Sequence, residues 1–140
     1  MMPFPKYQKS LRTKSKYHSK EIIRDGMTFD SVKEYRRFCD LTLLEKAGSI
    51  TDLKRQVEFE LIPSQFEEIP TGELYKRGEK KGMPKMKRVC VEQSIKYVAD
   101  FVYKENGKTI VEDTKGFKTK DYIIKRKLML WVHGIKIQEI

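Results

Sequence analysis

The spacing of apolar residues along the chain predicts an alternation of strands and helices. Residues 22–29 favour a short strand-turn segment, with Arg24-Asp25-Gly26 as the turn. Over residues 31–48 the apolar positions recur at helical spacing, and they are Val32, Tyr35, Phe38, Cys39, Leu41, Leu43 and Leu44. Ser31 followed by Glu34 matches a capping box at the start of this helix, and Gly48 favours a stop at its end.

The middle of the chain carries a strand followed by a charged segment that is rich in glycine. Residues 55–63 alternate Val57, Phe59 and Leu61 with glutamates, which is typical of a half-buried strand ended by a proline. Residues 64–87 hold three glycines, two prolines and many charges, so they predict a long basic loop or an open hairpin. A loop of that length in a small domain is usually functional or disordered.

The last third of the chain predicts a hairpin, a helix and a final strand. Residues 89–103 are strand-like, Asn106-Gly107 is a strong turn signal, and residues 108–115 return as the second strand. In the helix that follows, Thr119 is the expected cap and Gly134 the expected end. The residues expected to face inward are Ile123, Leu128, Leu130 and Trp131. Residues 135–140 predict a last short strand.

This order of elements predicts an α/β domain with a mixed central sheet flanked by helices. The final strand, coming after a helix, is expected to lie parallel to a neighbour. A chain of 140 residues suits one compact domain with a real core. We therefore expect a basic flexible arm over residues 1–20 and a single domain over residues 21–140.

The chain is strongly basic, with a formal net charge of +10. Residues 1–24 hold seven basic side chains and one acid, and residues 71–88 hold seven and two. Such clusters attract a polyanion, usually nucleic acid, although solvated lysine is the alternative. Cys39 and Cys90 lack CxxC spacing, so they predict neither a zinc site nor a disulfide framework and fit a reduced, cytoplasmic setting. No apolar run is long enough to predict a membrane span.

Two acidic residues stand on the strands of the predicted hairpin. A two-residue turn sets Glu105 opposite Lys108, and Asp113 then falls opposite Asp100 on the same face. Because opposed carboxylates repel, a divalent cation would relieve them, and Mg²⁺ prefers oxygen ligands. Lys115 shares the face of Asp113 and supplies positive charge for a phosphate oxygen or a nucleophilic water. The alternative is a wet strand face on which acids and a lysine coincide by chance.

Asp100, a hairpin and then Asp113-Thr114-Lys115 resemble the motifs of the PD-(D/E)XK nuclease superfamily. Ala99 stands where the proline of that name would be. The resemblance implies a restriction-endonuclease-like core of order α-β-β-β-α-β, which is the order predicted above. Over residues 27–62 and 95–140, the chain is also similar to small phage and prophage proteins that resemble Holliday-junction resolvases.

The resemblance implies a role for each matching residue. Asp100 and Asp113 would bind Mg²⁺, for which Mn²⁺ can substitute, and Glu34 would add a ligand directly or through water. Lys115 would orient or activate the attacking water. Four residues are expected near the DNA, and they are Gln56, Lys118, Lys120 and Lys125. The competing interpretations are helix capping for Glu34, an edge-facing position for Gln56 and plain solvation for each lysine.

The activity implied is metal-dependent hydrolysis of DNA phosphodiester bonds by an endonuclease. Its expected substrate is branched DNA such as a Holliday junction, in phage or prophage recombination inside a bacterial host. Because a resolvase cuts two symmetric strands, a homodimer is the economical arrangement. The alternatives are a nucleic-acid-binding module without catalysis and a structural or partner-binding phage protein.

Overall fold

The computed structural model describes residues 21–140, so the predicted basic arm over residues 1–20 lies outside the described residues. Two short strands and a helix come first, and they are β1 (Ile22–Arg24), β2 (Met27–Phe29) and α1 (Val32–Lys46). The chain continues through β3 (Thr51–Ile62), β4 (Gln65–Leu74), β5 (Pro84–Glu92), β6 (Ile95–Glu105) and β7 (Lys108–Asp113). It ends with α2 (Lys120–His133) and β8 (Gln138–Glu139).

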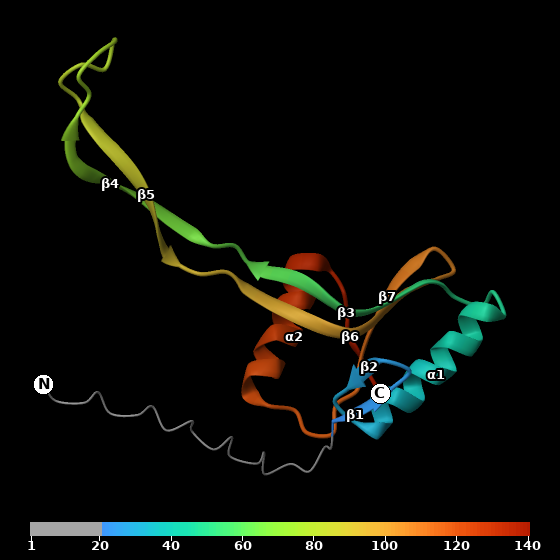
Figure 1. Cartoon of the computed structure of the whole chain (residues 1–140). Coiled ribbons are helices and arrows are strands. Elements are labelled where there is room, and N and C mark those ends of the chain that lie inside the picture. The colour runs from blue at the N-terminus through green and yellow to red at the C-terminus, as the bar shows by residue number, and fades with distance from the viewer. Residues whose placement is uncertain (1–20) are drawn as a thin grey trace, which may run out of the picture.

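A four-stranded sheet of order β3-β6-β7-β8 forms the centre of the molecule, and both helices pack against it (Figure 1). β3, β6 and β7 are antiparallel, whereas β8 runs parallel to β7, as expected for a strand that follows a helix. The predicted mixed α/β architecture is therefore confirmed. Within the described residues, neither helix combines the length and the apolar composition that a membrane span requires.

Side-chain caps fix where both helices begin. The Ser31 hydroxyl accepts the backbone N–H of Glu34 at 3.1 Å, and the Thr119 hydroxyl accepts that of Tyr122 at the same distance. Each bond satisfies a backbone donor that has no partner inside its helix. Gly134 ends α2 with a φ of +66°, a left-handed conformation that glycine adopts without steric cost. All three predicted signals are confirmed.

Two hydrophobic clusters divide the core between the helices. The cluster on α2 contains Leu61, Tyr97, Ala99, Val111, Tyr122, Met129 and Ile137. The cluster on α1 contains Leu41, Ile50, Phe101 and Tyr103. In a regular strand, Ala99 and Phe101 would lie on one face, yet here they belong to different clusters. The faces of β6 therefore switch at Asp100.

The neighbouring strand shows the physical cause of this switch. Gln56 lies between the pairs Arg55↔Phe101 and Val57↔Ala99, and it has a left-handed φ of +51°. A non-glycine residue in this region stores strain and turns the strand. The period-two alternation of residues 55–63 predicted a continuous strand and carried no sign of this turn.

Residues 65–92 form a second, separate ribbon. Among residues 21–140, strands β4 and β5 pair only with each other, and they extend beyond the ends of β3 and β6 (Figure 1). Of the two predicted alternatives for residues 64–87, the hairpin is present and the loop is not. The predicted strand over residues 89–103 is interrupted after Glu92, where the backbone N–H of Ser94 donates to the Ser64 hydroxyl at 3.0 Å.

The predicted inward face of α2 was wrong in part. Ile123 and Leu128 pack against the core, but Leu130 and Trp131 are 55% and 84% exposed. Met129 is fully buried instead, and each helical step of about 100° turns the next two residues away from the sheet. In α1, Leu43 is likewise exposed and Leu41 is the buried residue.

These positions predict opposite effects for two neighbouring truncations. Met129→Ala should lower the free energy of unfolding by about 2–5 kcal/mol, because it leaves a cavity in the core. Trp131→Ala should change it by less than about 0.5 kcal/mol, because the indole is already in water. Urea unfolding followed by circular dichroism measures both. A larger loss from Trp131→Ala than from Met129→Ala would contradict this assignment of the helix faces.

Candidate functional site

The hairpin of β6 and β7 has the register expected from its turn. Its pairs run from Glu105↔Lys108 to Phe101↔Glu112, so Asp100 and Asp113 are the next residues beyond the last pair. Asn106 has the positive φ that a two-residue turn of this kind requires. The two acids therefore meet where the ladder ends and where β6 switches faces.

Asp113 is buried with an incomplete set of partners. The Tyr97 hydroxyl donates to its Oδ2 at 2.5 Å. Its Oδ1 is buried and accepts no hydrogen bond, and the nearest ion-pair partner is Lys115 Nζ at 3.3 Å. The same ammonium lies 4.8 Å from the centre of the Tyr122 ring. Asp113 and Lys115 thus share a face, as predicted.

Burial raises the pKa of Asp113 to about 6, and the negative charge of Asp100 adds to the effect. The Tyr97 hydrogen bond and the Lys115 charge lower the pKa, but they do not offset the loss of water. Near neutral pH this side chain is therefore a buried carboxylate held at a cost, with one oxygen open to a further positive partner.

Asp100 is held by the residue that follows Asp113. Its Oδ2 accepts both the backbone N–H and the hydroxyl of Thr114, each at 2.8 Å. Its Oδ1 accepts a longer hydrogen bond of 3.4 Å from the Gln56 amide. These bonds fix the carboxylate at the fork between β6 and β7.

Glu34 reaches the same place from the first turn of α1. Its Oε2 accepts the backbone N–H of Asp30 at 2.9 Å, one residue before the predicted partner Ser31. Its Oε1 accepts the Gln56 amide at 3.2 Å and lies 3.6 Å from the Arg55 guanidinium. Burial raises the pKa of Glu34, and the Asp100 charge raises it further. Glu34 thus holds the backbone before the helix through Asp30 instead of completing the capping box with Ser31, and the same side chain lies beside the other acids.

Three residues of this site escaped the sequence analysis. Tyr97 and Thr114 hold the two aspartates, and Arg55 faces Glu34 while its guanidinium lies 3.9 Å from the centre of the Phe29 ring. Thr114 stands between Asp113 and Lys115, so its position was visible, but its side-chain partner was not. Gln56 bridges Glu34 and Asp100, so it neighbours the acids of the site, and its expected place beside the DNA stays a prediction.

The acid next to Asp113 serves a different purpose. Glu112 points to the other face, where Arg37 donates to it twice, at 2.5 and 2.8 Å, and the Tyr103 hydroxyl donates at 2.6 Å. Both carboxylate oxygens are satisfied, so the group needs no further cation. Of these two adjacent acids, Glu112 is thus fully paired with Arg37 and Tyr103, whereas Asp113 keeps an oxygen that accepts no hydrogen bond.

The predicted DNA-binding lysines are distributed near the start of α2. Lys118 forms an ion pair with Glu139, which Arg126 also contacts at 2.8 Å. These two cations lower the pKa of Glu139 to about 2. Lys120 is exposed and Lys125 is half-buried, and neither has an ion-pair partner within residues 21–140. Lys118 is therefore engaged inside the protein, whereas the other two can meet an external anion.

The donor atoms of the site suit a hard cation, because they are carboxylate oxygens. The buried Oδ1 of Asp113, which accepts no hydrogen bond, is the observation that fits a metal ligand. Across residues 21–140, however, no three His, Cys, Asp or Glu side chains are grouped as a metal site. The chemistry of the residues fits Mg²⁺, and their present arrangement supplies one open oxygen rather than a complete set of ligands.

The raised pKa predicts how the free energy of unfolding depends on pH. The reference pKa is 3.8 and the folded pKa is about 6, so the folded protein binds this proton first as the pH falls. Stability should rise as the pH drops through about 6, and this gain is complete below about 4. Asp113→Asn should abolish this dependence and stabilise the metal-free protein at about pH 8 by about 1–3 kcal/mol.

Urea unfolding with chelator at about pH 8 and about pH 5 tests this expectation. The matched control is Asp40→Asn, because Asp40 is exposed on α1 and has no ion pair within residues 21–140. It should leave both the stability and its pH dependence unchanged. A decrease in stability for Asp113→Asn at the higher pH would mean that the carboxylate is well satisfied where it lies.

Comparison with known proteins gives one match. No curated protein and no solved structure matches the chain. A family described as "Protein of unknown function (DUF1064)" matches residues 14–136, a range that contains Glu34, Gln56, Asp100, Asp113 and Lys115. Since this match covers most of its length, the chain belongs to the DUF1064 family.

Proposed function

We propose that this protein is a Mg²⁺-dependent DNA endonuclease of the PD-(D/E)XK type. The observation that carries the proposal is the buried Asp113, whose Oδ1 accepts no hydrogen bond and faces Lys115 beside Asp100. The element order α1-β3-β6-β7-α2-β8 supports it, because a restriction-endonuclease-like core has the order α-β-β-β-α-β. The hairpin β4–β5 is then an insertion between two core strands.

The acids have distinct roles in this proposal. Asp100 and Asp113 would hold Mg²⁺ or Mn²⁺, and Glu34 would add a ligand directly or through water. The bound cation would supply Lewis-acid chemistry, lowering the pKa of a water and stabilising negative charge on the phosphate. Tyr97 contributes by occupying Oδ2 of Asp113, which leaves Oδ1 for the metal. Thr114 contributes by fixing Asp100.

Lys115 would act beside the metal rather than on it. An ammonium group has donors but no lone pair, so it cannot be a ligand. Held by Asp113 and the Tyr122 ring, it can donate to the attacking water or to a phosphate oxygen. Charge on the phosphate develops in the transition state, so this contact would accelerate cleavage more than it strengthens binding.

The substrate that we propose is branched DNA, in the manner of a Holliday-junction resolvase in phage or prophage recombination. The exposed Lys120 and the half-buried Lys125 would contact phosphates, which fixes position without reading sequence. Cutting two symmetric strands of a junction calls for two active sites, so the proposal includes a homodimer. The cellular setting of the proposal is the cytoplasm of a bacterial host.

The second candidate is a nucleic-acid-binding module without catalysis. The observation that favours it is that residues 21–140 contain no group of three metal-binding side chains. A vestigial site could keep Asp100 and Glu34 as structural acids bridged by Gln56. Cleavage measured with Mg²⁺ and with chelator on junction, duplex, flap and single-stranded DNA decides between the two candidates.

Removing either proposed metal ligand should separate cleavage from binding. Asp100→Asn and Asp113→Asn should each reduce cleavage by at least about 100-fold, because a metal ligand is lost. DNA binding should persist or tighten, because a negative charge near the phosphate is gone. Cleavage of labelled four-way junction DNA and binding to it in chelator measure the two effects. Turnover at the wild-type rate by either variant would remove these residues from the active site.

Replacing the lysine should affect the chemical step alone. Lys115→Ala should slow cleavage by about 100-fold or more, because a donor to the transition state is lost. Its affinities for Mn²⁺ and DNA, measured by calorimetry, should stay near those of the wild type. Lys127→Ala is the matched control, since Lys127 is an exposed lysine on α2, and it should cut normally. Equal rates for the two variants would leave the Asp-Thr-Lys motif without a catalytic role.

A further inference from the structure

The ribbon of β4 and β5 stands apart from the site described above. It continues from the far ends of β3 and β6, and no other strand of the described part of the chain pairs with it (Figure 1). β4 has ten residues, and at about 3.4 Å per residue the ribbon reaches about 34 Å beyond its start. Two-stranded ribbons are marginally stable in water by themselves, so a surface on which this one can lie would complete it.

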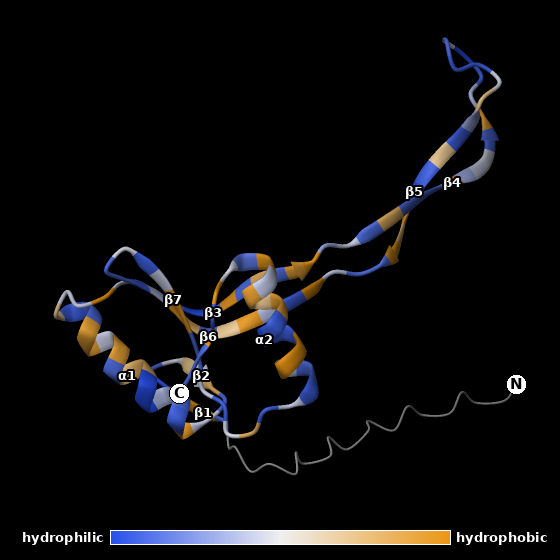
Figure 2. Cartoon of the chain, turned by 180° about the vertical axis from the view of Figure 1, so that it is seen from behind, coloured by the Kyte–Doolittle hydropathy of each residue, from blue (hydrophilic) through white to orange (hydrophobic). Residues whose placement is uncertain are grey.

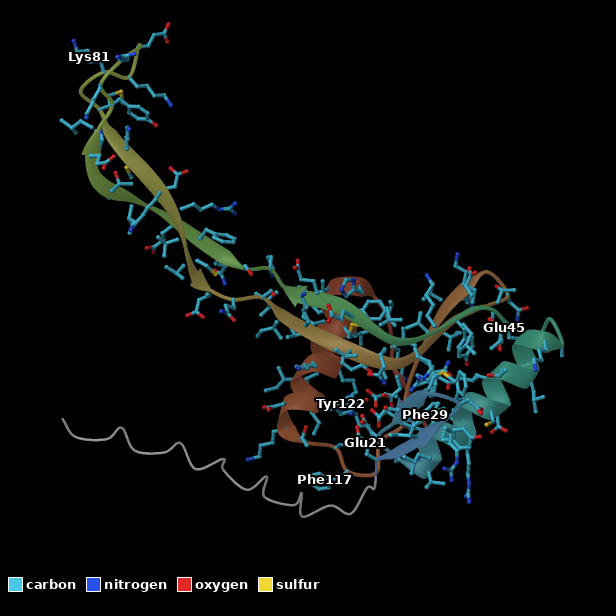
Figure 3. The ribbon with its side chains drawn as sticks, in the orientation of Figure 1. Glu21, Phe29, Glu45, Lys81, Phe117 and Tyr122 are labelled. Carbon is cyan, nitrogen blue, oxygen red and sulfur yellow. The ribbon has the colours of Figure 1, made fainter. Side chains whose placement is uncertain are left out.

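The turn at the end of the ribbon is ordered by its own backbone. The Tyr75 N–H donates to the Met83 carbonyl at 2.9 Å, and the Gly82 N–H donates to the Tyr75 carbonyl at 2.9 Å. Lys81 lies at the outermost end of the molecule (Figure 3). Hydrophilic residues dominate this turn, which is blue in Figure 2.

Positive charge is concentrated at this end. Residues 75–88 contain one acid, Glu79, and seven basic side chains, which are Lys76, Arg77, Lys80, Lys81, Lys85, Lys87 and Arg88. Of the remaining acids of the ribbon, Glu67, Glu68 and Glu92 lie toward its base, whereas Glu73 lies beside the turn, where it faces Lys85. The ribbon is therefore polarised, with its cations at the far end.

Three of these seven cations have contacts inside the part of the protein that the structure describes, and two of the three, Lys80 and Lys85, lie 5.8 and 5.7 Å from the centre of the Tyr75 ring. Lys85 lies 3.9 Å from an exposed carboxylate of Glu73, and the Arg88 guanidinium lies 3.7 Å from the centre of the Phe66 ring. Within residues 21–140, the side chains of Lys76, Arg77 and Lys81 have no ion-pair partner. Unpaired like charges held together on a narrow turn repel, and a polyanion would relieve that repulsion.

We propose that the β4–β5 ribbon is a DNA-binding arm whose turn contacts the phosphate backbone of duplex DNA away from the cleavage site. The turn lies about one strand length beyond the end of β3, and one turn of B-DNA spans about 34–36 Å. If Asp113 lies at one phosphate, the turn of the ribbon would therefore contact the same duplex about one helical turn or more away from that phosphate. A two-stranded ribbon also fits the width of the major groove.

Duplex DNA is a better occupant for the arm than a second copy of this chain. A partner copy would carry the same seven cations over residues 75–88 of its own ribbon. Like charges brought together across an interface oppose association. The exposed apolar residues of the ribbon, Phe66, Leu74, Met83, Met86 and Val91, are spread along both strands between charged neighbours. The concentration of positive charge at the far end of the ribbon therefore favours duplex DNA over a second copy as its partner.

This inference rests on the proposed function for its choice of substrate, and its test measures binding instead of cleavage. The tip variant is Lys76→Gln, Arg77→Gln and Lys81→Gln combined, in the full chain. The matched control combines Lys46→Gln, Lys104→Gln and Lys108→Gln, which removes three exposed charges from the opposite end of the molecule (Figure 1). Both should melt like the wild type, because none of these side chains lies in the core.

Binding is measured in chelator against four-way junctions with arms of about 8 and about 30 base pairs. On the long arms, the tip variant should bind at least about tenfold more weakly than the wild type. The slope of log affinity against log salt concentration should become less steep by about two to three. On the short arms, the tip variant and the wild type should bind alike, because that DNA ends before the turn. The control variant should keep the wild-type difference between long and short arms.

Three results would contradict the proposed DNA-binding role of the ribbon. The first is an equal loss of DNA affinity in the tip and control variants, and the second is an equal loss of affinity by the tip variant on short-armed and long-armed junctions. The third is a change in the oligomeric state of the tip variant, measured by sedimentation. The last would assign the ribbon to contacts between copies. Wild-type protein that cuts no DNA in Mg²⁺, yet binds long arms through its tip, would refute the proposed function and leave the arm in place.

Discussion

Burial of acidic side chains is the constraint on which the centre of this molecule depends. Glu34, Glu112 and Asp113 lie at or near zero exposure, where a carboxylate without partners is costly. Glu112 receives two bonds from Arg37 and one from Tyr103, and Glu34 receives a backbone N–H, an amide and a nearby guanidinium. Asp113 alone keeps an oxygen without a hydrogen bond. Because Glu34 and Glu112 have hydrogen-bond partners on both oxygens and Asp113 does not, Asp113 is the buried acid that could bind a further ligand.

The switch of faces in the sheet explains why the acids meet where they do. At Asp100, β6 changes from the cluster on α2 to the cluster on α1, and Gln56 turns left-handed beside it. A continuous pleat would fill this position with an apolar side chain from one core or the other. The break instead leaves a polar gap between the two cores, which Gln56 spans from Glu34 to Asp100. Strain at one backbone position thus makes room for a site.

The two ends of the β3–β6 pair have different physical demands. Near the helices, side chains of β3 and β6 are buried in the two hydrophobic clusters, and this packing holds the strands in place. Beyond Ser64 the same two segments continue as a ribbon against which neither described helix packs, and strand pairing and turn hydrogen bonds hold it. Its polarised charge suits an external polyanion. The proposed active site and the proposed arm therefore lie on consecutive stretches of the same two segments of the chain.

Local signals in the sequence determined much of this fold. Asn106-Gly107 set the hairpin register, and with it the meeting of Asp100 and Asp113, because a two-residue turn allows one pairing. Ser31, Thr119 and Gly134 set helix boundaries, since capping involves residues three or four apart. The position of Lys115 beside Asp113 followed from the period of a strand.

Other features were decided only by the tertiary structure, because they depend on residues far apart in the chain. The left-handed turn at Gln56, the break at Ser94 and the exposure of Trp131 have no local signature. Tyr97 and Asp113 are sixteen residues apart, and Gln56 and Asp100 are forty-four apart, so their hydrogen bonds exist only once the sheet has formed. A sequence pattern shows which side chains share a face, whereas burial and partnership are set by what the rest of the chain packs against that face.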